Sequence, residues 1–467
     1  MWFRRDLRLS DHPALHAAHR AGGTEGVAGV FIADDELLAP AGPSRVRYLA
    51  ACLDALDRSM AGALILREGP PAKALVSLVH ELGARQVFIT TDHGPYGRAR
   101  DEAVRAALGD VGCELVAVGS NYVAAPGSIS NDRGEGFQVF GAFRRRFEAL
   151  APPACLPAPR VTWWRTSSEL APSGLPLRAG KRLASHVATV PLSPPVELPV
   201  AGERAALERL TAFADDDAST YQARRDLVAE HGTSRLSWHL RFGALHPRRV
   251  LAEVNGEDEG SRSFRTEIAW REFYADVLFR HPSSARQALK ASMAELRVDS
   301  GAQAQERFEA WASGRTGLPL IDAAMRQLTA LGWMHNRARM LSASFLVKHL
   351  HLDWRWGARW FMFQLIDGDL ASNSHGWQWT AGTGTDAAPY HRIFNPVVQA
   401  KRFDPDATYI HRWVPELRGT TPPEVFEPGG GEGLLKPPSY HEPIVELAVE
   451  RDEALARFAE LRSVPRT

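Results

Sequence analysis

Short apolar runs alternate with amphipathic stretches over about the first 125 residues of the chain. The runs have the composition of β-strands and lie at residues 27–32, 63–66, 86–90 and 114–118. Between them, residues 45–56 and 72–82 repeat apolar side chains every three or four positions, which indicates helices. Strands that alternate with helices form right-handed βαβ units and a parallel sheet. The pattern predicts an α/β domain over residues 1–125, although no G-x-G-x-x-G follows a run.

The stretch from 126 to 200 has the composition of a connection between domains. Its second part, residues 151–200, holds ten of the 31 prolines of the chain. Proline removes a backbone donor and blocks helices, so such a stretch is extended. We expect an interdomain linker at 126–200 that is proline-rich from residue 151.

Helical periodicity dominates the remainder, residues 201–467, and predicts an all-helical second domain. One helix is marked by apolar positions from Leu320 to Leu331 and should stop at Gly332. Leu341 and Phe345 continue the apolar face on the next helix. The glycine-rich segment 429–433 interrupts the pattern, and one short helix from about His441 is expected to close the chain.

Tryptophan is concentrated in one stretch, residues 353–390. Five of the 13 tryptophans lie there, around Asp367-Gly368-Asp369 and Asn373. Ordinary cores rarely gather indole in this way, because aliphatic side chains fill space with less constraint on shape. Short polar groups beside large aromatic faces suit a flat, polar, redox-active ring system. A tryptophan-rich helical core with a capped loop is the alternative interpretation.

Composition limits the kinds of partner that the chain can have. Lys plus Arg and Asp plus Glu both total 55 in 467 residues, so any nucleic-acid surface has to be a local patch. Three widely spaced cysteines provide neither a disulfide framework nor a metal site. No apolar run approaches a membrane span, and no signal-peptide pattern opens the chain. We therefore expect a cytoplasmic protein without a metal or a membrane segment.

Several longer motifs are more specific than these patterns. They are WFRRDLRLSDHPAL at 2–15, GTSRLS at 232–237, WREFY at 270–274, DAAMRQL at 322–328, GWMHNRARMLSASFLVK at 332–348 and IDGDLASNSHGWQWTAGTGTDAAPYHRIFNP at 366–396. Together, and in this order, they resemble the photolyase/cryptochrome family, most closely its class I cyclobutane pyrimidine dimer photolyases. The resemblance implies a Rossmann-like parallel-sheet domain followed by an all-helical FAD-binding domain.

The resemblance implies a light-dependent DNA repair enzyme. Photoexcited reduced FAD would pass one electron to a cyclobutane pyrimidine dimer and regain it after the ring has split. The alternative on the same fold is a cryptochrome, a blue-light signalling flavoprotein without repair activity, and fold alone does not decide between them. A cryptochrome of the single-strand-specific DASH type is a lesser alternative.

Residues 232–237 place hydroxyl groups and an arginine ahead of a helical run, which suits phosphate binding. From the residues alone, a helix cap at Ser234 is the simpler interpretation. The resemblance instead implies an FAD-diphosphate site. Its members would be Tyr221, Thr233, Ser234, Arg235, Leu236 and Ser237.

The resemblance places the flavin itself in the tryptophan-rich stretch. Asp367, Gly368 and Asp369 would contact the flavin and its ribityl chain, and Arg271 would also bind the cofactor. Arg339 would pair with Asp367 and counter the negative charge of a reduced flavin. Asn373 would face the redox-active ring nitrogen, where an amide can hydrogen-bond without supplying a proton.

A second group of residues has the spacing of shared helical faces. Glu267 lies three residues before Trp270, and Trp333, Asn336, Arg337 and Met340 repeat spacings of three and four. The plain interpretation is a helical core with a Glu267–Arg271 surface pair. The resemblance implies a cavity for a flipped-out dimer, with Trp270 and Trp379 stacked on it and Glu267 and Asn336 bonded to its edges. The (6-4) class has histidine where this chain has Met340.

A basic rim is expected around that cavity. Its candidates are Arg225, Arg337, Arg392 and Lys401, with Lys348 and other cations of the tryptophan-rich region nearby. A solvated helix face explains the same charges. Phosphate contacts of this kind hold DNA without reading its sequence. The expected partner is double-stranded DNA containing pyrimidine dimers, bound by a monomer.

The resemblance also implies an antenna chromophore. Tyr96-Gly97 is similar to family members that carry 8-hydroxy-5-deazaflavin, whereas members that bind methenyltetrahydrofolate have Asn-Glu there. Further candidates for the pocket are Phe31, Asp34, Arg45 and Asp92. A turn followed by a helix start accounts for the same residues without a ligand.

The last expectation concerns electron transfer to the flavin. Related proteins pass electrons inward through three tryptophans, and the motif match makes Trp377 the innermost and Trp354 the middle one. Counting back from Trp311 without gaps, the outermost position falls on Gly301. Glycine cannot be oxidised, so another outer donor is expected, and Trp311, Trp356 and Trp360 are the remaining candidates.

Overall fold

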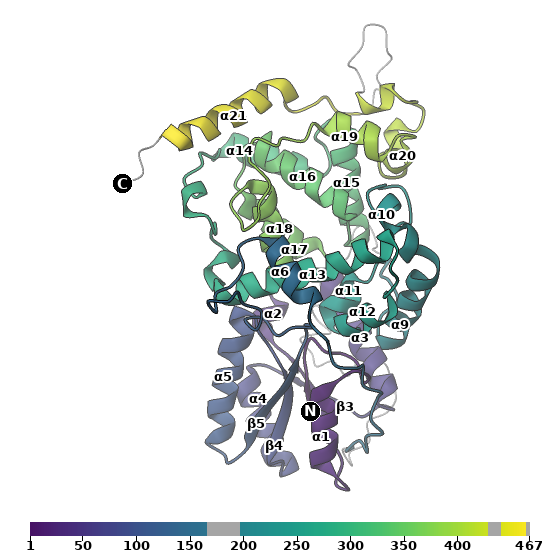
Figure 1. Cartoon of the computed structure of the whole chain (residues 1–467), viewed down its shortest axis with the longest axis vertical. Helices are drawn as coiled ribbons and strands as arrows, with labels where there is room; N and C mark the ends of the chain where they lie inside the picture. Colours follow the sequence, from purple (N-terminus) through teal and green to yellow (C-terminus); the bar gives the residue numbers. More distant parts are fainter. Residues whose placement is uncertain (166–196, 428–439, 464–467) are drawn as a thin grey trace.

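The computed structural model describes residues 1–165, 197–427 and 440–463. An α/β domain forms one end of an elongated molecule and helices form the other end (Figure 1). The strands are β1 (Trp2–Phe3), β2 (Gly29–Ala33), β3 (Leu64–Glu68), β4 (Gln86–Thr91) and β5 (Glu114–Ser120). All pairs are parallel, in the orders β1-β2-β3 and β4-β5, and β1 contacts β4. The predicted parallel-sheet fold is confirmed.

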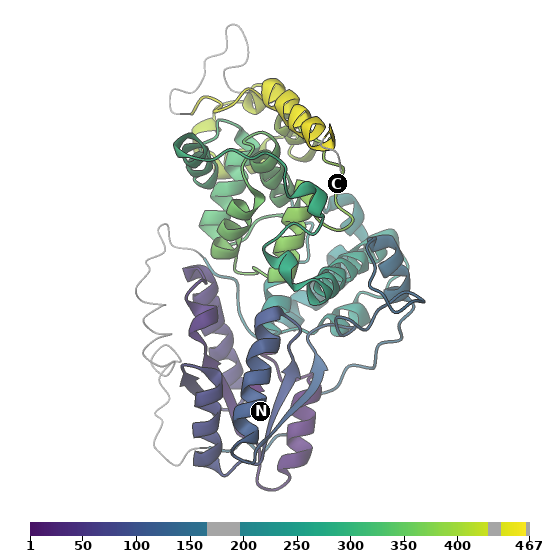
Figure 2. The same ribbon diagram turned by 90° about the vertical axis from the view of Figure 1, so that its left-hand side faces the viewer.

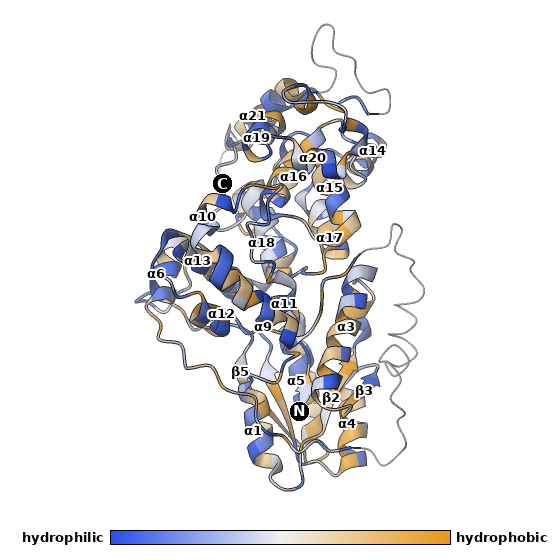
Figure 3. Ribbon diagram, turned by 90° about the vertical axis from the view of Figure 1, so that its right-hand side faces the viewer, coloured by the Kyte–Doolittle hydropathy of each residue, from blue (hydrophilic) through white to orange (hydrophobic). Residues whose placement is uncertain are grey.

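Helices cover both faces of these strands. They are α1 (Pro13–Gly22), α2 (Asp35–Leu38), α3 (Pro43–Ser59), α4 (Pro71–Leu82) and α5 (Pro95–Gly109). Successive strand residues point to opposite faces, so Trp2 and Val30 pack with α4 and α5, whereas Phe3 and Phe31 pack with α1 and α3. Figure 3 shows the hydrophobic colouring on β2 and on the neighbouring α4.

The interval predicted as a linker contains a helix, α6 (Phe140–Glu148). Its Phe143 and Phe147 are buried, and Phe143 packs 5.2 Å from Phe273 in the helical domain. The predicted linker therefore includes a packed helix, because three phenylalanines provide an apolar face that the proline count did not reveal. Residues 166–196 of the proline-rich part lie outside the described residues.

The second domain is helical, as predicted. Its helices are α9 (Glu203–Ala212), α10 (Tyr221–Arg224), α11 (Ser237–Phe242), α12 (Pro247–Glu253), α13 (Glu259–Arg280), α14 (Ala302–Ala312), α15 (Pro319–Leu331), α16 (Asn336–Lys348), α17 (Trp354–Gln364), α18 (Leu370–Ala381), α19 (Pro396–Phe403), α20 (Thr408–Trp413) and α21 (Leu447–Ser463). A π-helix (Phe213–Asp217) and 3-10 turns (Ala218–Thr220, Pro282–Ala285, Ala291–Met293, Pro415–Leu417 and Glu424–Phe426) complete it. Among the described helices, none is long and apolar enough to cross a bilayer.

Two sequence expectations for this domain can be compared with the structure. Helix α15 ends at Gly332, which adopts a left-handed φ of 61° as the predicted stop signal requires. The last helix begins at Leu447, later than the predicted start near His441. The glycine-rich segment 429–433 lies outside the described residues.

The two domains share buried apolar contacts. Tyr48 of α3 packs 5.3 Å from Phe242 of α11, and Trp333 and Ile366 belong to the same cluster. Helix α3 also contacts α17, and Figure 2 shows α3 rising from the α/β domain toward the helical domain. This junction positions the site described next.

Candidate active site

The loop Asp367-Gly368-Asp369 joins α17 to α18. Asp369 caps α18, because its Oδ1 accepts a hydrogen bond from Ser372 N at 3.2 Å. Arg339 Nη2 donates to Asp367 Oδ2 at 2.8 Å, so the predicted ion pair is present. Asp367 Oδ1 is buried and has no hydrogen-bond partner within the described chain. A buried acceptor without a donor is costly, and this oxygen is therefore available for a ligand N–H or O–H.

Two arginines that the sequence analysis missed hold the other side of this loop. Arg5 Nη2 donates to Asp369 Oδ2 at 2.6 Å, and Arg241 Nε donates to Gly368 O at 2.6 Å. The first contact joins residues 364 positions apart and the second joins residues 127 positions apart, so no local sequence pattern predicts either of them. Burial alone would raise the pKa of Asp369, but Arg5, Arg241 and Arg271 lower it well below its usual range. Burial lowers the pKa of Arg241 to about 9.

Arg45, predicted as an antenna residue, lies against the same loop. Its Nε donates to Leu365 O at 3.0 Å, and its Nη2 is buried without a partner within the described chain. A Cβ on Gly368 would lie 2.7 Å from that Nη2, so a larger residue at 368 would displace the guanidinium. Burial lowers the pKa of Arg45 to about 10, against the effects of Asp367 and Asp369. Arg45 therefore lies beside the loop, and its antenna role stays a prediction.

Helix α18 presents Asn373 and Trp377 behind the loop. Asn373 Nδ2 donates to Ala358 O of α17 at 2.9 Å, which fixes the amide and leaves Oδ1 as its acceptor. Trp377 is buried against Gly357, where a Cβ would lie 2.0 Å from the indole. Trp354 is buried in the same hydrophobic cluster. Asn373 can therefore accept an N–H from a bound ring but cannot give it a proton.

The segment 232–237 precedes α11, and Arg235 within it is unusual. Its φ is +51°, its guanidinium lies 5.1 Å from the Trp333 ring, and its Nε is buried without a partner within the described chain. Burial lowers the pKa of Arg235, and Arg209 and Arg412 lower it further. A cation that has other cations nearby and no carboxylate partner in the described part of the chain favours a bound anion. Helix α11 starts at Ser237, so Ser234 is not its cap residue.

Three buried N–H groups without partners gather around Trp333. Its ring lies 6.2 Å from Trp238 and 6.4 Å from His335. His335 Nδ1 accepts from Arg337 N, so the proton is on Nε2, which has no partner in the described chain; neither do Trp238 Nε1 and Arg235 Nε. Trp333 was predicted beside the lesion, but the structure places it with the 232–237 segment. Trp238 and His335 are functional candidates that the sequence analysis missed.

Two other predicted cofactor residues make different contacts from those expected. Tyr221 is buried between Phe213 and Phe264, at 6.0 and 5.2 Å, in an aromatic cluster. Arg271 donates to Asn121 O at 3.3 Å and lies 4.4 Å from the Tyr122 ring. Within the described chain Arg271 forms no hydrogen bond with the loop, but its positive charge helps to lower the pKa of Asp369. The Glu267–Arg271 surface pair, which was the plain interpretation of the spacing, is not formed.

Glu267 pairs instead with Arg225. Arg225 Nη1 donates to Glu267 Oε1 at 2.6 Å, and it also donates to Ser263 Oγ at 3.3 Å. Burial raises the pKa of Glu267, and Arg225 opposes this rise. Arg225 thus favours the ionised form of Glu267 at a partly buried position, and this carboxylate can accept hydrogen bonds from a ligand.

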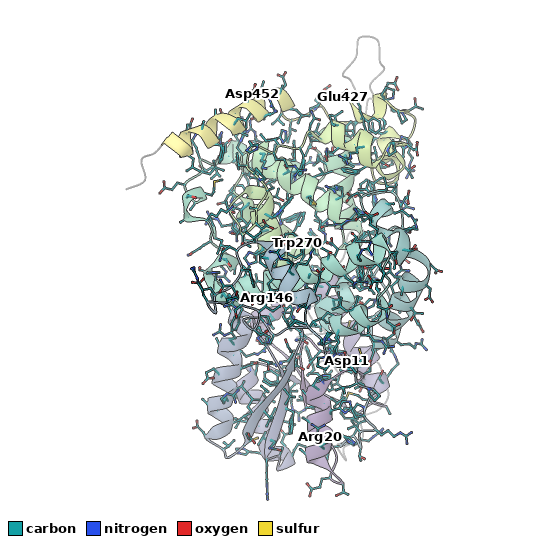
Figure 4. All side chains as sticks on the ribbon, in the orientation of Figure 1. Asp11, Arg20, Arg146, Trp270, Glu427 and Asp452 are labelled. Carbon is teal, nitrogen blue, oxygen red and sulfur yellow. The ribbon has the colours of Figure 1, made fainter. Side chains whose placement is uncertain are left out.

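Trp270 lies near the middle of the molecule (Figure 4), and one of its faces is already covered. Phe140, the first residue of α6, stacks on it with a centroid distance of 3.6 Å and an interplanar angle of 10°. Phe140 N donates to Asp386 Oδ2 at 3.2 Å, and Thr385 Oγ1 donates to Gln138 O at 2.5 Å. Phe140 therefore covers one face of Trp270, and the bonds of Phe140 N and Gln138 O tie this end of α6 to the loop after Trp379.

The remaining predicted lesion residues lie on α16 and beyond. Asn336 is exposed, and its Nδ2 lies 3.9 Å from Met340 Sδ on the next turn. Arg337 forms two hydrogen bonds with Asp226, at 3.1 and 2.5 Å, so its charge is already countered. Trp379 is half-buried.

The basic rim is smaller than predicted. Arg392 is exposed beside Phe394, and Lys401 lies 3.7 Å from Glu427. Lys348 is 1 % exposed and donates to Arg392 O at 3.0 Å, so it supports this region from inside and is not part of the rim. Burial lowers the pKa of Lys348 to about 8.

Comparison with known proteins agrees with this geometry. Residues 1–160 match the model of DNA photolyase, and residues 264–460 match the model of the FAD binding domain of DNA photolyase. The chain is 38% identical to the deoxyribodipyrimidine photo-lyase of Halobacterium salinarum, over 99% of this chain and 98% of the relative. It is 37% identical to that of Escherichia coli, with the same coverage. The chain belongs to the DNA photolyase family.

A solved photolyase has the same fold. The chain superposes with a TM-score of 0.89 on a bacterial class III photolyase from Agrobacterium tumefaciens, at 33% identity and covering 99% of this chain and 97% of that one. An archaeal photolyase from Sulfolobus tokodaii, described with two FAD molecules, gives a TM-score of 0.83 at 28% identity, covering 98% and 99%.

In this photolyase, the expected antenna residues lie at the carboxyl ends of β2 and β4, where ligands bind in parallel sheets. Tyr96 OH donates to Asp34 Oδ2 at 2.5 Å, and Arg100 Nη2 donates to Asp92 Oδ2 at 3.2 Å. Phe31 is buried in β2. A Cβ on Gly97 would lie 2.1 Å from Asp92 Cγ, so the small residue after Tyr96 is required by this packing.

Proposed function

We propose that this chain is a deoxyribodipyrimidine photo-lyase, a light-dependent enzyme that splits cyclobutane pyrimidine dimers in DNA. One observation carries the proposal: the Asp367–Arg339 pair leaves Asp367 Oδ1 buried and without a partner within the described chain, and the Asn373 amide, which donates to Ala358 O, offers its Oδ1 as an acceptor. Reduced FAD, when bound and excited by light, supplies the electron that opens the dimer. Full-length similarity to proteins of this name supports the same conclusion.

The protein residues orient and neutralise the cofactor. Asp367 Oδ1 and Asn373 Oδ1 accept hydrogen bonds from the flavin and its ribityl chain, and Arg339 counters negative charge. Arg235 binds the diphosphate together with Thr233, Ser234 and Ser237, which supply hydroxyl and backbone donors. Trp238 Nε1 and His335 Nε2 extend this set, because both donors are buried and unpaired within the described chain.

The lesion residues form the substrate side of the same site. Glu267, held by Arg225, and Asn336 accept and donate hydrogen bonds at the edges of the flipped-out dimer. Trp379 and Trp270 contact its rings, next to Met340. Arg392 and Lys401 contact flanking phosphates of double-stranded DNA. The enzyme acts as a monomer in the cytoplasm.

The antenna is proposed to be 8-hydroxy-5-deazaflavin, bound near Phe31, Asp34, Asp92 and Tyr96. The Tyr96-Gly97 pair supports this choice over methenyltetrahydrofolate. The Sulfolobus tokodaii structure is described with two FAD molecules, with the implication of a novel light-harvesting cofactor. Absorption spectra of protein from a deazaflavin-producing host separate the three chromophores.

The decisive experiment is repair by chemically reduced holoenzyme. The protein is loaded with FAD, reduced with dithionite and illuminated with dimer-containing double-stranded DNA, and restored thymines are counted. We expect repair in the light and none in the dark. A flavoprotein that binds FAD and restores no thymine under these conditions would instead be a signalling cryptochrome.

A further inference from the structure

Phe140 and Trp270 form the closest ring pair among the described residues. Their ring centroids lie 3.6 Å apart with an interplanar angle of 10°, whereas aromatic pairs usually lie offset or edge to face with centroids about 4.5–7 Å apart. A parallel pair this close is less favourable than an offset pair, so contacts from the surrounding structure must hold the two rings in place. Those contacts come from α13 and from the loop after α18.

Helix α13 restricts the indole from its own next turn. Phe273 and Tyr274 lie 5.8 Å and 5.3 Å from the Trp270 ring. Phe140 also meets Phe273 edge to face at 5.7 Å. Trp270 therefore has an aromatic neighbour on one face and two more from its own helix, which together limit its rotation about the side-chain bonds.

The backbone of Phe140 connects this pair to the second tryptophan of the proposed lesion site. Phe140 N donates to Asp386 Oδ2 at 3.2 Å. Two residues further along the same loop, Ala388 N donates to Trp379 O at 3.1 Å. The ring of Phe140 thus touches Trp270, and its amide is tied to the loop that returns to Trp379. One residue of α6 links the two indoles.

The chemistry of a cyclobutane dimer makes such a link useful. Two C–C bonds join its pyrimidine rings and saturate the carbons at the junction, so the rings are puckered and fixed at an angle to each other. Undamaged neighbouring pyrimidines are flat and can stack in parallel. Two indoles held at a constant separation and orientation fit only one of these shapes well, whereas mobile indoles adapt to both.

We propose that Phe140 is a positioning residue that, through its ring and its bond to Asp386, fixes Trp270 relative to Trp379 and so makes the site select the rigid dimer over undamaged pyrimidines. The inference rests on the proposed function, because the dimer is the substrate in question. Phe140 is 7 % exposed and acts through Trp270, without touching the DNA.

The first test compares two phenylalanines of the same helix. Phe140→Leu removes the ring that stacks on Trp270. Phe147→Leu is the matched control, because Phe147 is 5 % exposed on α6 and its ring pairs with Phe143 at 6.3 Å. Affinity for double-stranded DNA with and without one thymine dimer is measured for each FAD-loaded protein by fluorescence anisotropy, and urea unfolding is measured beside it.

We expect Phe140→Leu to bind dimer-containing DNA roughly twofold to tenfold more weakly, which corresponds to the loss of one aromatic pair. Binding to undamaged DNA depends on phosphates and should stay at the wild-type level. Phe147→Leu should lower stability and keep the wild-type ratio of the two affinities. Phe140→Tyr keeps a flat ring in the same place and should restore that ratio.

The second test uses Asp386, which is exposed and has φ +44°. Asp386→Gly tolerates this φ and removes the acceptor of the Phe140 N–H. Asp386→Asn also tolerates it and keeps an acceptor oxygen, and both changes remove the same charge. We expect a lower affinity ratio in the glycine variant than in the asparagine variant. This pair keeps the inference testable if Phe140→Leu does not fold.

Three outcomes would overturn the inference. They are a wild-type affinity ratio in Phe140→Leu, an equal fall of the ratio in Phe147→Leu, and equal ratios in the two Asp386 variants. Repair by dithionite-reduced wild type is measured in parallel. If wild type repairs dimers and any of these outcomes occurs, only the role of Phe140 fails. If wild type neither selects nor repairs dimer-containing DNA, the proposed function fails and the inference fails with it.

Discussion

Two groups of polar residues differ in how their atoms are paired. The cofactor group lies in the loops before α11, α16 and α18, with Arg45 of α3 beside the last of them, and the antenna group lies at the carboxyl ends of β2 and β4. In the cofactor group, Asp367 Oδ1, Arg45 Nη2, Arg235 Nε and His335 Nε2 have no partner within the described chain. In the antenna group, Tyr96 bonds Asp34 and Arg100 bonds Asp92. The first group is incomplete without a ligand, whereas the second is already satisfied.

The difference bears on affinity. A ligand that enters the cofactor group gains hydrogen bonds that the protein alone lacks, because the unpaired groups are already desolvated. A ligand that enters the antenna group first has to break bonds that the protein makes with itself. We infer that FAD binding is built into the fold and that antenna binding is weaker and easier to lose.

Among the changes considered, Asp367→Asn should have the largest effect on ligand binding. The change removes the negative charge beside Arg339 and alters the free acceptor, and breaking a partly buried pair in this way costs about 3–5 kcal/mol. We expect FAD to be lost from the purified protein. Flavin absorbance per protein and a titration of the apoprotein with FAD measure the loss.

The matched control is Asp54→Asn, which breaks the exposed pair with Arg58 on α3. Surface pairs contribute at most about 1 kcal/mol, and FAD binding should stay at the wild-type level. Wild-type FAD affinity in Asp367→Asn would show that its free oxygen is not a cofactor contact.

Glu272 is a buried carboxylate that has hydrogen-bond partners, unlike Asp367 Oδ1, and it should affect stability and not FAD binding. It is 2 % exposed, accepts from Ala124 N at 3.1 Å and pairs with Arg271. Burial raises its pKa to about 7 from an ordinary 4.5, with Arg271 opposing. Between these values the folded state binds more protons than the unfolded state, so the free energy of unfolding falls as pH rises from about 4.5 to 7.

The change across that window is at most about 3 kcal/mol. Glu272→Gln imitates the protonated form and should flatten this part of the stability profile while FAD binding persists. Urea unfolding of the two proteins at several pH values measures it. Parallel profiles for wild type and variant would mean that Glu272 does not titrate in this range.

The sequence predicted the elements well where periodicity was strong. Strands β2 to β5 and the stop of α15 at Gly332 follow from local patterns that the fold does not override. Helix α6 was missed because its three phenylalanines lie in a stretch that glycine and proline dominate on both sides.

The candidate site was predictable only in part. The Asp367–Arg339 pair came from the family resemblance, and the structure contains it. The places of Arg5, Arg241 and Phe140, and the contact of Arg45 with Leu365, depend on distant segments that no spacing rule brings together. No sequence pattern marked Trp238 and His335 as binding residues, because an unpaired N–H can be recognised only when the surrounding structure is known.

Trp379→Ala extends the comparison to the proposed DNA-binding side of the site. Trp379 is half-buried, so an aromatic face remains available for a base. Stacking contributes about 1–3 kcal/mol per base, and we expect dimer-containing DNA to lose this much affinity. Binding to undamaged DNA depends on phosphates and salt and should barely change. Equal losses on both DNAs, measured by fluorescence anisotropy, would make Trp379 structural.

Tyr96→Phe should change ligand affinity least, and it tests whether the internal hydrogen bonds of the antenna group weaken antenna binding. The change keeps the ring and removes the hydroxyl that donates to Asp34 at 2.5 Å. If an incoming deazaflavin has to break that bond, the variant should bind it more tightly, by about 0.5–1.5 kcal/mol. Fluorescence titration with the deazaflavin measures the change, and Tyr48→Phe, whose hydroxyl lies 3.3 Å from His239, is the control. Weaker binding would mean that Tyr96 OH contacts the antenna itself, and stoichiometric folate would exclude a deazaflavin site.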